Sequence, residues 1–290
     1  MARIVCVHGV GKQQAGEHTL LREWVPALRD GMARAGATAP VADMDVAMAF
    51  YGDLFLPPGQ RLAGDDPHLS WWDVSSGWET DLLMEWWGHA AATETHIVAP
   101  DTRNLLSGTS RVVQAALLAV SQSRFFAGLA EKALISDLKQ THRYLTEPEL
   151  RTTARDRVRA LIGPDTRVVV AHSLGSVVAY EALCAEPGHA VRSFVTLGSP
   201  LGIRNLIFDR IDPLPVRGRG SWPGPPSTLW TNVADLRDVV ALAKDLRPCF
   251  GPDIACHLVP NGSQAHDATH YLTKQVTGAA LALGLGLGLD

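Results

Sequence analysis

The stretch Val168–Tyr180, VVVAHSLGSVVAY, decides how the chain is expected to fold. It opens with the apolar run VVVA, which predicts a strand covered on both faces, and a helix-forming run follows almost directly. Between them stands Ser173, with the small residues Ala171 and Gly175 two positions away on either side. Small residues at these positions permit a sharp strand-to-helix turn that lifts the serine hydroxyl above the sheet edge. The pattern is therefore that of the G-x-S-x-G nucleophile elbow, with alanine in place of the first glycine.

Short apolar runs of the same kind recur along the chain and alternate with helix-length segments. Their near-continuous apolar character favours strands that are buried on both faces. Helical spacing extends over residues 20–35, 177–185 and 135–162, and we expect a break at Pro148 in the last of these. This alternation predicts an α/β fold with a mostly parallel central sheet flanked by helices. The expected strands are residues 4–7, 46–51, 168–171, 194–197, 229–233 and 255–259.

Residues 55–134 interrupt the alternation. They show no strand pattern, contain the helical stretches DLLMEWWGHAA and RVVQAALLAV, and hold five of the eight tryptophans: Trp71, Trp72, Trp78, Trp86 and Trp87. We expect a helical, Trp-rich insertion at 55–134 within a single α/β domain spanning residues 1–290. Its aromatic side chains would either form an extra core layer or cap a pocket for an apolar ligand, and the sequence leaves both interpretations open.

The composition excludes several classes of function. The chain has 290 residues, a net charge of −4 and 46% hydrophobic residues, so no basic footprint indicates a nucleic-acid partner or an anionic membrane surface. No stretch reaches the ~18 consecutive apolar residues that a membrane span needs, and no secretory signal is visible. The C-terminal AALALGLGLGLD is expected to fray. These features predict a soluble, cytoplasmic protein, and they indicate no particular oligomeric state.

The first apolar run leads into a glycine turn, HGVGK at residues 8–12. A phosphate loop of the form G-x-x-x-x-G-K-[ST] would require glycine at position 6 and serine or threonine at position 13. The chain has Cys6 and Gln13 there. The turn fits an oxyanion loop better, in which a backbone N–H points at a reacting carbonyl oxygen.

Candidate partners for Ser173 follow in the chain order serine, acid, histidine. Asp235 and Asp238 come after the strand at 229–233, and His266 and His270 come after the strand at 255–259. The carboxyl ends of strands in an α/β sheet are where such folds place their sites. His266 and His270 also have the spacing of a metal-binding pair, but the glutamate of H-E-x-x-H is missing, so we predict no metal site.

Five motifs together resemble the α/β-hydrolase superfamily, in its broad lipase and serine-esterase part: IVCVHGVG, VVVAHSLGS, FVTLGSPLG, NVADLRDVVA and HDATHYL. The likeness covers residues 1–51 and about 135–280. It implies that Ser173 is the nucleophile. It also favours Asp238 as the acid, because the family's acid often stands in a D-x-V stretch, with Asp235 as the alternative. His266 is favoured as the base, because it precedes Tyr271-Leu272 at the last helix, with His270 as the alternative.

The same resemblance assigns the oxyanion-binding N–H groups to Val10 and Leu174. It implies a cofactor-independent serine hydrolase that cleaves carboxylic esters through an acyl-enzyme, and the aromatic insertion favours an apolar acyl group. The partner would be a small-molecule or lipid-like acyl substrate. A thioesterase, an amidase or peptidase, or an acyltransferase would use the same residues. A hypothesis of a different class is a non-catalytic binding module on a hydrolase scaffold.

Overall fold

The centre of the computed structural model is a six-stranded sheet in which every neighbouring pair is parallel. The structure describes residues 1–56, 69–100, 110–123 and 131–290. The strand order is β2-β1-β3-β4-β5-β6, and each of the six expected strands is present. The strands are β1 Ile4–Val7, β2 Val46–Ala49, β3 Val168–His172, β4 Ser193–Leu197, β5 Leu229–Ala234 and β6 Ala255–Leu258.

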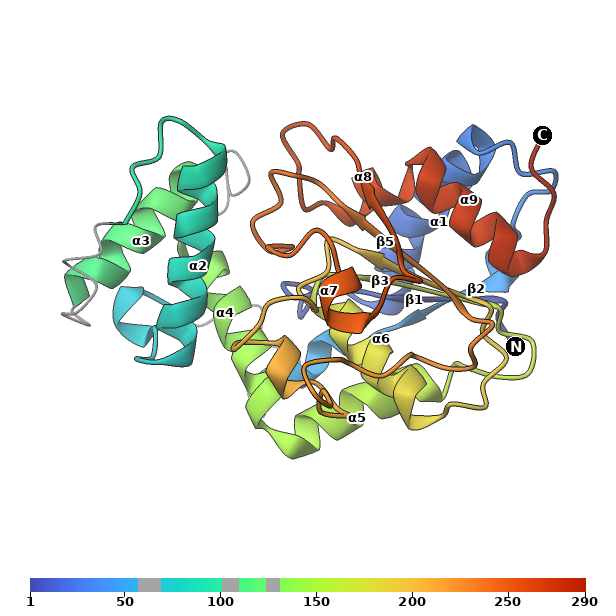
Figure 1. Ribbon diagram of the computed structural model, residues 1–290, viewed down its shortest axis with the longest axis horizontal. Helices are drawn as coiled ribbons and strands as arrows, with labels where there is room; N and C mark the ends of the chain where they lie inside the picture. Colours follow the sequence, from blue (N-terminus) through green and yellow to red (C-terminus); the bar gives the residue numbers. More distant parts are fainter. Residues whose placement is uncertain (57–68, 101–109, 124–130) are drawn as a thin grey trace.

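Helices cover both faces of this sheet, as Figure 1 shows. One face is covered by α1 (Glu17–Arg34), α8 (Ala268–Leu272) and α9 (Gln275–Leu285), which pack on one another and on the strands. The other face is covered by α6 (Leu174–Ala185), with α5 (Pro148–Arg159) packed against it. The short α7 (Arg247–Phe250) precedes β6. The expected break at Pro148 is confirmed, because α4 (Glu131–Thr146) ends just before it and proline begins α5.

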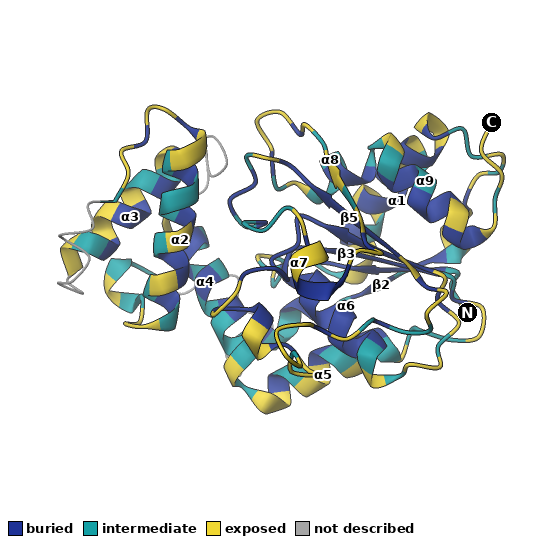
Figure 2. Ribbon diagram, viewed as in Figure 1, coloured by how far each residue is buried: buried dark blue, intermediate teal, exposed yellow. Residues whose placement is uncertain are grey.

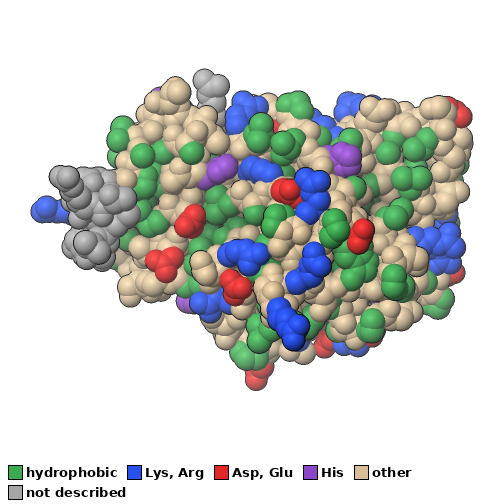
Figure 3. Space-filling model, in the orientation of Figure 1, with side chains coloured by type: hydrophobic (Ala, Val, Ile, Leu, Met, Phe, Trp, Pro, Cys, Tyr) green, Lys and Arg blue, Asp and Glu red, His purple; other side chains and the backbone are tan. Residues whose placement is uncertain are grey.

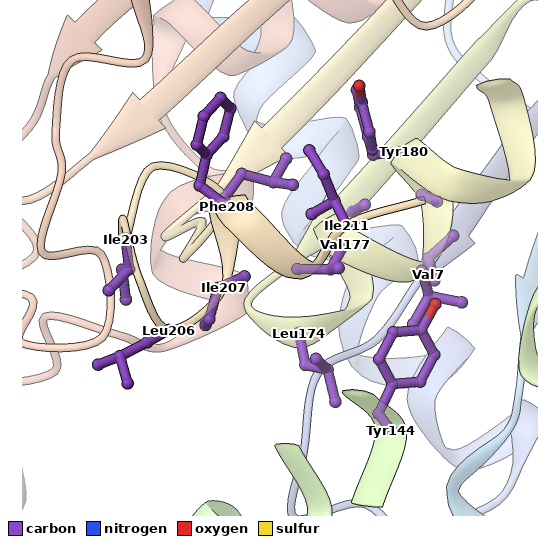
Figure 4. Packing of buried hydrophobic residues seen from close by; sticks show 14 of the residues in the cluster. Val7, Tyr144, Leu174, Val177, Tyr180, Ile203, Leu206, Ile207, Phe208 and Ile211 are labelled. Carbon is purple, nitrogen blue, oxygen red and sulfur yellow. The ribbon is translucent and has the colours of Figure 1, made fainter. Parts of the chain in front are cut away.

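Side chains of the central strands point alternately into two separate cores. Ile4 and Cys6 of β1 belong to the core under α1 and α9, whereas Val5 and Val7 belong to the core under α6. The alternation follows from the two-residue period of a strand. Figure 2 shows the resulting band of buried residues through the sheet, and Figure 4 shows Val7 in the second core among aliphatic and aromatic side chains. Burying each large apolar side chain contributes about 1.5–3 kcal/mol.

The described part of the insertion contains helices and connecting loops, and no strand. Apart from the short 3-10 turn Trp71–Asp73, its helices are α2 (Trp78–Thr93), α3 (Ser110–Gln122) and the start of α4. Leu82 and Trp86 of α2 are buried and belong to the same core as the sheet face under α6. By contrast, Trp72 is 67% exposed. The rest of the predicted 55–134 segment, residues 57–68, 101–109 and 124–130, lies outside the described residues.

Two expectations about the last third of the chain are wrong. Strand β6 is largely exposed, with Leu258 55% accessible. The other edge strand, β2, is buried because α1 packs on it. The C-terminal apolar stretch does not fray, since α9 continues to Leu285 and buries Leu281 completely against α1. Among the helices that the structure describes, none combines the length and the apolar character needed to cross a bilayer.

Charged side chains on the surface follow no single sign. On the face drawn in Figure 3, Lys and Arg side chains lie among Asp and Glu side chains over the middle of the molecule. Oppositely charged side chains of the molecule also form ion pairs, such as Arg157 with Asp53 and Arg159 with Glu186. This distribution agrees with the small net charge of −4.

Candidate active site

The turn between β3 and α6 holds Ser173 in a backbone conformation that a serine rarely adopts. Its φ is 53° and its ψ is −132°. Such a geometry costs about 1–3 kcal/mol and persists only where the surroundings impose it. Here the serine N–H donates to the carbonyl oxygen of Leu197 on the next strand at 3.0 Å. The turn therefore directs the Ser173 side chain into a cavity at the carboxyl edge of the sheet.

Two glycines let the turn after β1 lie directly against this serine turn. A Cβ on Gly9 would stand 2.7 Å from the Ser173 Cβ, and a Cβ on Gly175 would stand 2.2 Å from the carbonyl oxygen of His8. Any side chain at either position would separate the two turns. The glycines of HGVG and HSLGS thus bring the N-terminal turn and the serine turn into backbone contact.

His8 fixes the conformation of the N-terminal turn. The Tyr51 N–H donates to His8 Nε2 at 3.1 Å, so Nδ1 carries the ring proton and donates to the Gly9 carbonyl oxygen at 2.7 Å. The imidazole stacks on the Tyr51 ring with centroids 4.3 Å apart. Burial lowers the pKa of His8 to about 4, so the ring is neutral at neutral pH. His8 therefore orders the backbone that carries Val10.

Ser173, His266 and Asp238 form a continuous hydrogen-bonded chain. His266 Nδ1 donates to Asp238 Oδ2 at 2.8 Å, because a carboxylate can only accept. His266 Nε2 is then the free acceptor, and Ser173 Oγ lies 2.9 Å from it with its hydroxyl proton available to donate. The serine is at the end of β3, the aspartate follows β5 and the histidine follows β6. The structure thus brings Ser173 together with Asp238 and His266, the favoured residues of the two pairs of candidates.

The Asp238 carboxylate is completely buried and satisfied by four donors. Oδ1 accepts the backbone N–H groups of Val240 at 2.9 Å and Ala241 at 3.1 Å. Oδ2 accepts the Tyr271 hydroxyl at 2.7 Å in addition to His266 Nδ1. These contacts fix the plane of the carboxylate, so its orientation toward His266 does not depend on the histidine alone.

Opposing effects act on the charge of Asp238. Burial by itself raises the pKa of this carboxyl group. The positive charge that His266 can carry, the hydrogen bond from His266, the Lys244 ammonium and the Tyr271 hydroxyl together outweigh burial and lower the pKa below its usual value. Asp238 is therefore ionised at neutral pH, the state that stabilises a protonated imidazole beside it.

The alternative residues have other partners. Asp235 Oδ1 accepts the backbone N–H of Arg237 at 2.8 Å, and its second oxygen accepts the backbone N–H of Asn261. His270 Nδ1 lies 3.1 Å from the Asn261 carbonyl oxygen. Both residues thus stabilise the loops that carry Asp238 and His266. Among the described residues, no group of three or more His, Cys, Asp or Glu side chains is arranged to hold a metal ion.

His172 makes a contact that its sequence position does not reveal. Its Nε2 lies 2.7 Å from the His266 carbonyl oxygen, and since a carbonyl only accepts, Nε2 carries the proton and donates. The two imidazole rings lie 4.5 Å apart. Burial, with the nearby His266, lowers the pKa of His172 to about 3, which keeps the ring neutral. The residue before the serine therefore supports the backbone of the histidine that faces it.

The N–H groups expected to bind an oxyanion belong to residues that line the cavity, Val10 and Leu174. Leu174 is the first residue of α6, so the helix makes no internal use of its N–H. Helix α4 stabilises the turn that carries Val10, because the Gly11 N–H donates to Gln140 Oε1 of α4 at 3.2 Å.

The cavity beside Ser173 has a volume of about 460 Å³. Its apolar lining comes from α2, from the segment after β4 and from the segment after Asp238: Leu82, Trp86, Pro200, Ile203, Ile207 and Val240. Figure 4 shows Ile203 and Ile207 near Leu174, where this lining joins the core. The polar lining is Lys12, Asp137, Thr141, Ser263, Gln264 and Asp267. Sequence reasoning missed Asp137, which lies in a helix with an ordinary apolar spacing.

No protein-family model matches this chain, and a comparison with curated proteins finds no relative. The function is therefore inferred from the fold, the geometry of the serine site and the lining of the cavity.

Proposed function

We propose that this chain is a cofactor-independent serine hydrolase with an α/β-hydrolase fold, and that it cleaves carboxylic esters. The observation that supports the proposal is the Ser173–His266–Asp238 chain of hydrogen bonds, with distances of 2.9 and 2.8 Å, opening into a cavity. A serine hydroxyl is a weak nucleophile until a neighbouring base accepts its proton. A strained serine turn adds to this support, since strain of this kind concentrates at functional sites.

Each group has one role in the proposed reaction. Ser173 Oγ forms a bond to the ester carbonyl carbon while its proton passes to His266 Nε2, and Asp238 stabilises the imidazolium. The bond to the alcohol then breaks, and His266 returns the proton to the leaving oxygen. A water molecule repeats the sequence on the acyl-serine and releases the carboxylic acid. The N–H groups of Val10 and Leu174 would stabilise the oxyanion, and losing one such donor costs on the order of 10²–10³ in rate.

We further propose that the 55–134 insertion is a cap over the site. Leu82 and Trp86 of α2 line the cavity that contains Ser173. Trp78 at the start of the same helix donates its Nε1–H to the Leu206 carbonyl oxygen at 2.9 Å, and this contact connects the insertion with the segment after β4. Trp86 would thus act both as core and as cavity wall.

A fluorophosphonate tests the proposal, because it forms a stable adduct only with an activated serine. Intact-mass analysis and peptide mapping would follow the wild type and the variants Ser173→Ala, His266→Ala and His270→Ala. We expect one adduct on Ser173, no adduct in Ser173→Ala, strong slowing in His266→Ala and normal labelling in the matched control His270→Ala. A folded wild type that forms no adduct would contradict the proposal and favour a non-catalytic binding module.

If the fluorophosphonate labels the wild type, esters, thioesters and amides can then be ranked by their kcat/KM with this protein. Esters are expected to react faster than amides, because the alcohol leaving group needs less assistance from His266 than an amine. A thioester or amide preferred by more than tenfold would move the assignment to a thioesterase or a peptidase.

A further inference from the structure

One wall of the cavity carries a carboxylate that the proposed reaction does not use. Asp137 of α4 lines the same cavity as Ser173 and His266. Its Oδ1 lies beside the turn that carries Val10, at 3.3 Å from the place that a Cβ on Gly11 would occupy. The carboxylate therefore stands close to where a reacting ester group would lie.

The Asp137 carboxylate has no side-chain partner among the residues that the structure describes. Within the ranges that the structure describes, no hydrogen bond and no ion pair reaches either of its oxygens, although its backbone carbonyl accepts the Thr141 hydroxyl at 2.9 Å. Burial raises the pKa of Asp137 to about 7, while His266 and Lys12 act in the opposite direction. Lys12 lines the same wall, and its ammonium likewise has no hydrogen-bond partner among the described residues.

A plain alkyl chain suits this wall poorly. Filling the cavity with hydrocarbon would remove water from Asp137 without offering it a donor, and leaving a buried polar group unsatisfied costs about 5- to 150-fold in an equilibrium or rate constant. An ammonium group on the substrate would meet Asp137 but would also face the Lys12 ammonium. A hydroxyl group suits both, because it donates to the carboxylate and accepts from the ammonium.

We propose that Asp137 determines substrate specificity and that the preferred substrates are esters that carry a hydroxyl group near the scissile carbonyl. This inference rests on the proposed function. It refines the expectation of a purely apolar acyl group, since Leu82, Trp86 and Ile203 would hold the apolar part of the substrate while Asp137 and Lys12 hold the hydroxyl.

The test compares matched esters that differ by hydroxyl groups. Propyl butanoate against glyceryl monobutanoate places the hydroxyls on the alcohol, and ethyl butanoate against ethyl 3-hydroxybutanoate places one on the acyl group. The variants are Asp137→Leu, similar in size but apolar, and Asp137→Asn. Asp253→Leu is the matched control, because Asp253 is an exposed carboxylate outside the cavity. Circular dichroism would verify folding.

In the wild type, we expect the hydroxylated ester of at least one pair to have a kcat/KM at least tenfold higher. Asp137→Leu should reduce this ratio by tenfold or more, chiefly by improving the plain ester, and Asp253→Leu should leave it unchanged. The inference would be overturned if the two esters of each pair had equal kcat/KM in the wild type. It would also be overturned if the preference for the hydroxylated ester survived in Asp137→Leu.

Binding to the Ser173→Ala variant separates this inference from the proposed function. Calorimetric titration with the same esters needs no turnover. We expect the hydroxylated ester to bind more tightly, and the additional change Asp137→Leu to abolish the difference. If this binding difference were found but the wild type cleaved no ester, the proposed hydrolase activity would be refuted and the binding role of Asp137 would stand. Equal binding of the paired esters would refute the role of Asp137 alone.

Discussion

Replacing Gly198 by alanine should disable the site while leaving the fold intact. Gly198 follows β4 with a φ of +54°, and it packs against the hydrogen-bonded side chains. A Cβ at this position would stand 2.7 Å from Asp238 Oδ2, 3.0 Å from His266 Nδ1 and 3.1 Å from the Tyr271 ring. The new methyl group would therefore press on both ends of the bond that joins the acid to the base.

The size of the effect follows from these distances. To reach an ordinary contact of 3.4 Å, the Asp238 oxygen must retreat from 2.7 Å, a movement of about 0.7 Å. The 2.8 Å bond to His266 would then lengthen beyond a useful hydrogen bond. Loss of the hydrogen bond between the aspartate and the histidine lowers the rate of serine acylation by a factor on the order of 10²–10⁴.

The matched control is Gly262→Ala in the loop that carries His266. Gly262 has a similar φ of +69°, but a Cβ there would meet no atom within 4 Å. Both variants bear the backbone cost of alanine at positive φ, about 1–2 kcal/mol, so urea unfolding should show a loss of at least that size in each. Only Gly198→Ala should lose fluorophosphonate labelling by 10²-fold or more. Equal labelling rates in the two variants would refute the reasoning.

Substitutions at three further residues test the surroundings of the site. Tyr271→Phe removes the hydroxyl from buried Asp238, so we expect unfolding in urea to be about 1–3 kcal/mol easier and labelling about 3- to 30-fold slower. His172→Phe removes the donor to the His266 carbonyl oxygen and should slow labelling about tenfold, whereas His172→Gln, whose amide can donate, should restore most of the rate; equal rates would contradict a positioning role. Asp137→Asn should stabilise the protein at high pH. The folded pKa of Asp137 is about 7, above the unfolded value, so the wild type loses stability as the pH rises from about 4 through 7. The variant lacks this titration, and its advantage in the free energy of unfolding should grow by about 1–4 kcal/mol between pH 4 and pH 8. If urea titrations gave the same difference in the free energy of unfolding at every pH in this range, the pKa of Asp137 would not be raised.

Much of the fold could be predicted from the sequence because its strands are continuous apolar runs. All six were predicted, with boundaries shifted by one or two residues at most. The exposure of β6 was not predictable, because burial of an edge strand depends on whether a helix packs on it, as α1 does on β2, and the strand's own residues do not encode this. The docking of α9 was missed for a similar reason. Its glycine-rich end suggests mobility, while its packing against α1 is a long-range contact.

Some residues of the candidate site could likewise be predicted from the sequence, and others could not. Ser173 stands out because a tight turn between strand and helix restricts its neighbours, and the aspartate and histidine follow strands in a fixed order. Asp137 gives no such signal, because it lies among Leu134, Ile135 and Leu138 in a helix whose pattern indicates only core packing. That its carboxylate faces the cavity depends on how α4 docks against the turn at Gly11, which is a tertiary contact.

The position of the insertion has a consequence for synthesis of the protein. Strands β1 and β3 are neighbours in the sheet, but residues 8–167 separate them in the chain. At about 5–20 residues per second, a ribosome takes roughly 8–32 seconds to deliver β3 after β1. Throughout that interval one edge of β1 has no partner, and an open apolar edge invites pairing with other chains. The helices made in between would be the first part of the nascent chain able to shelter that edge before β3 is synthesised.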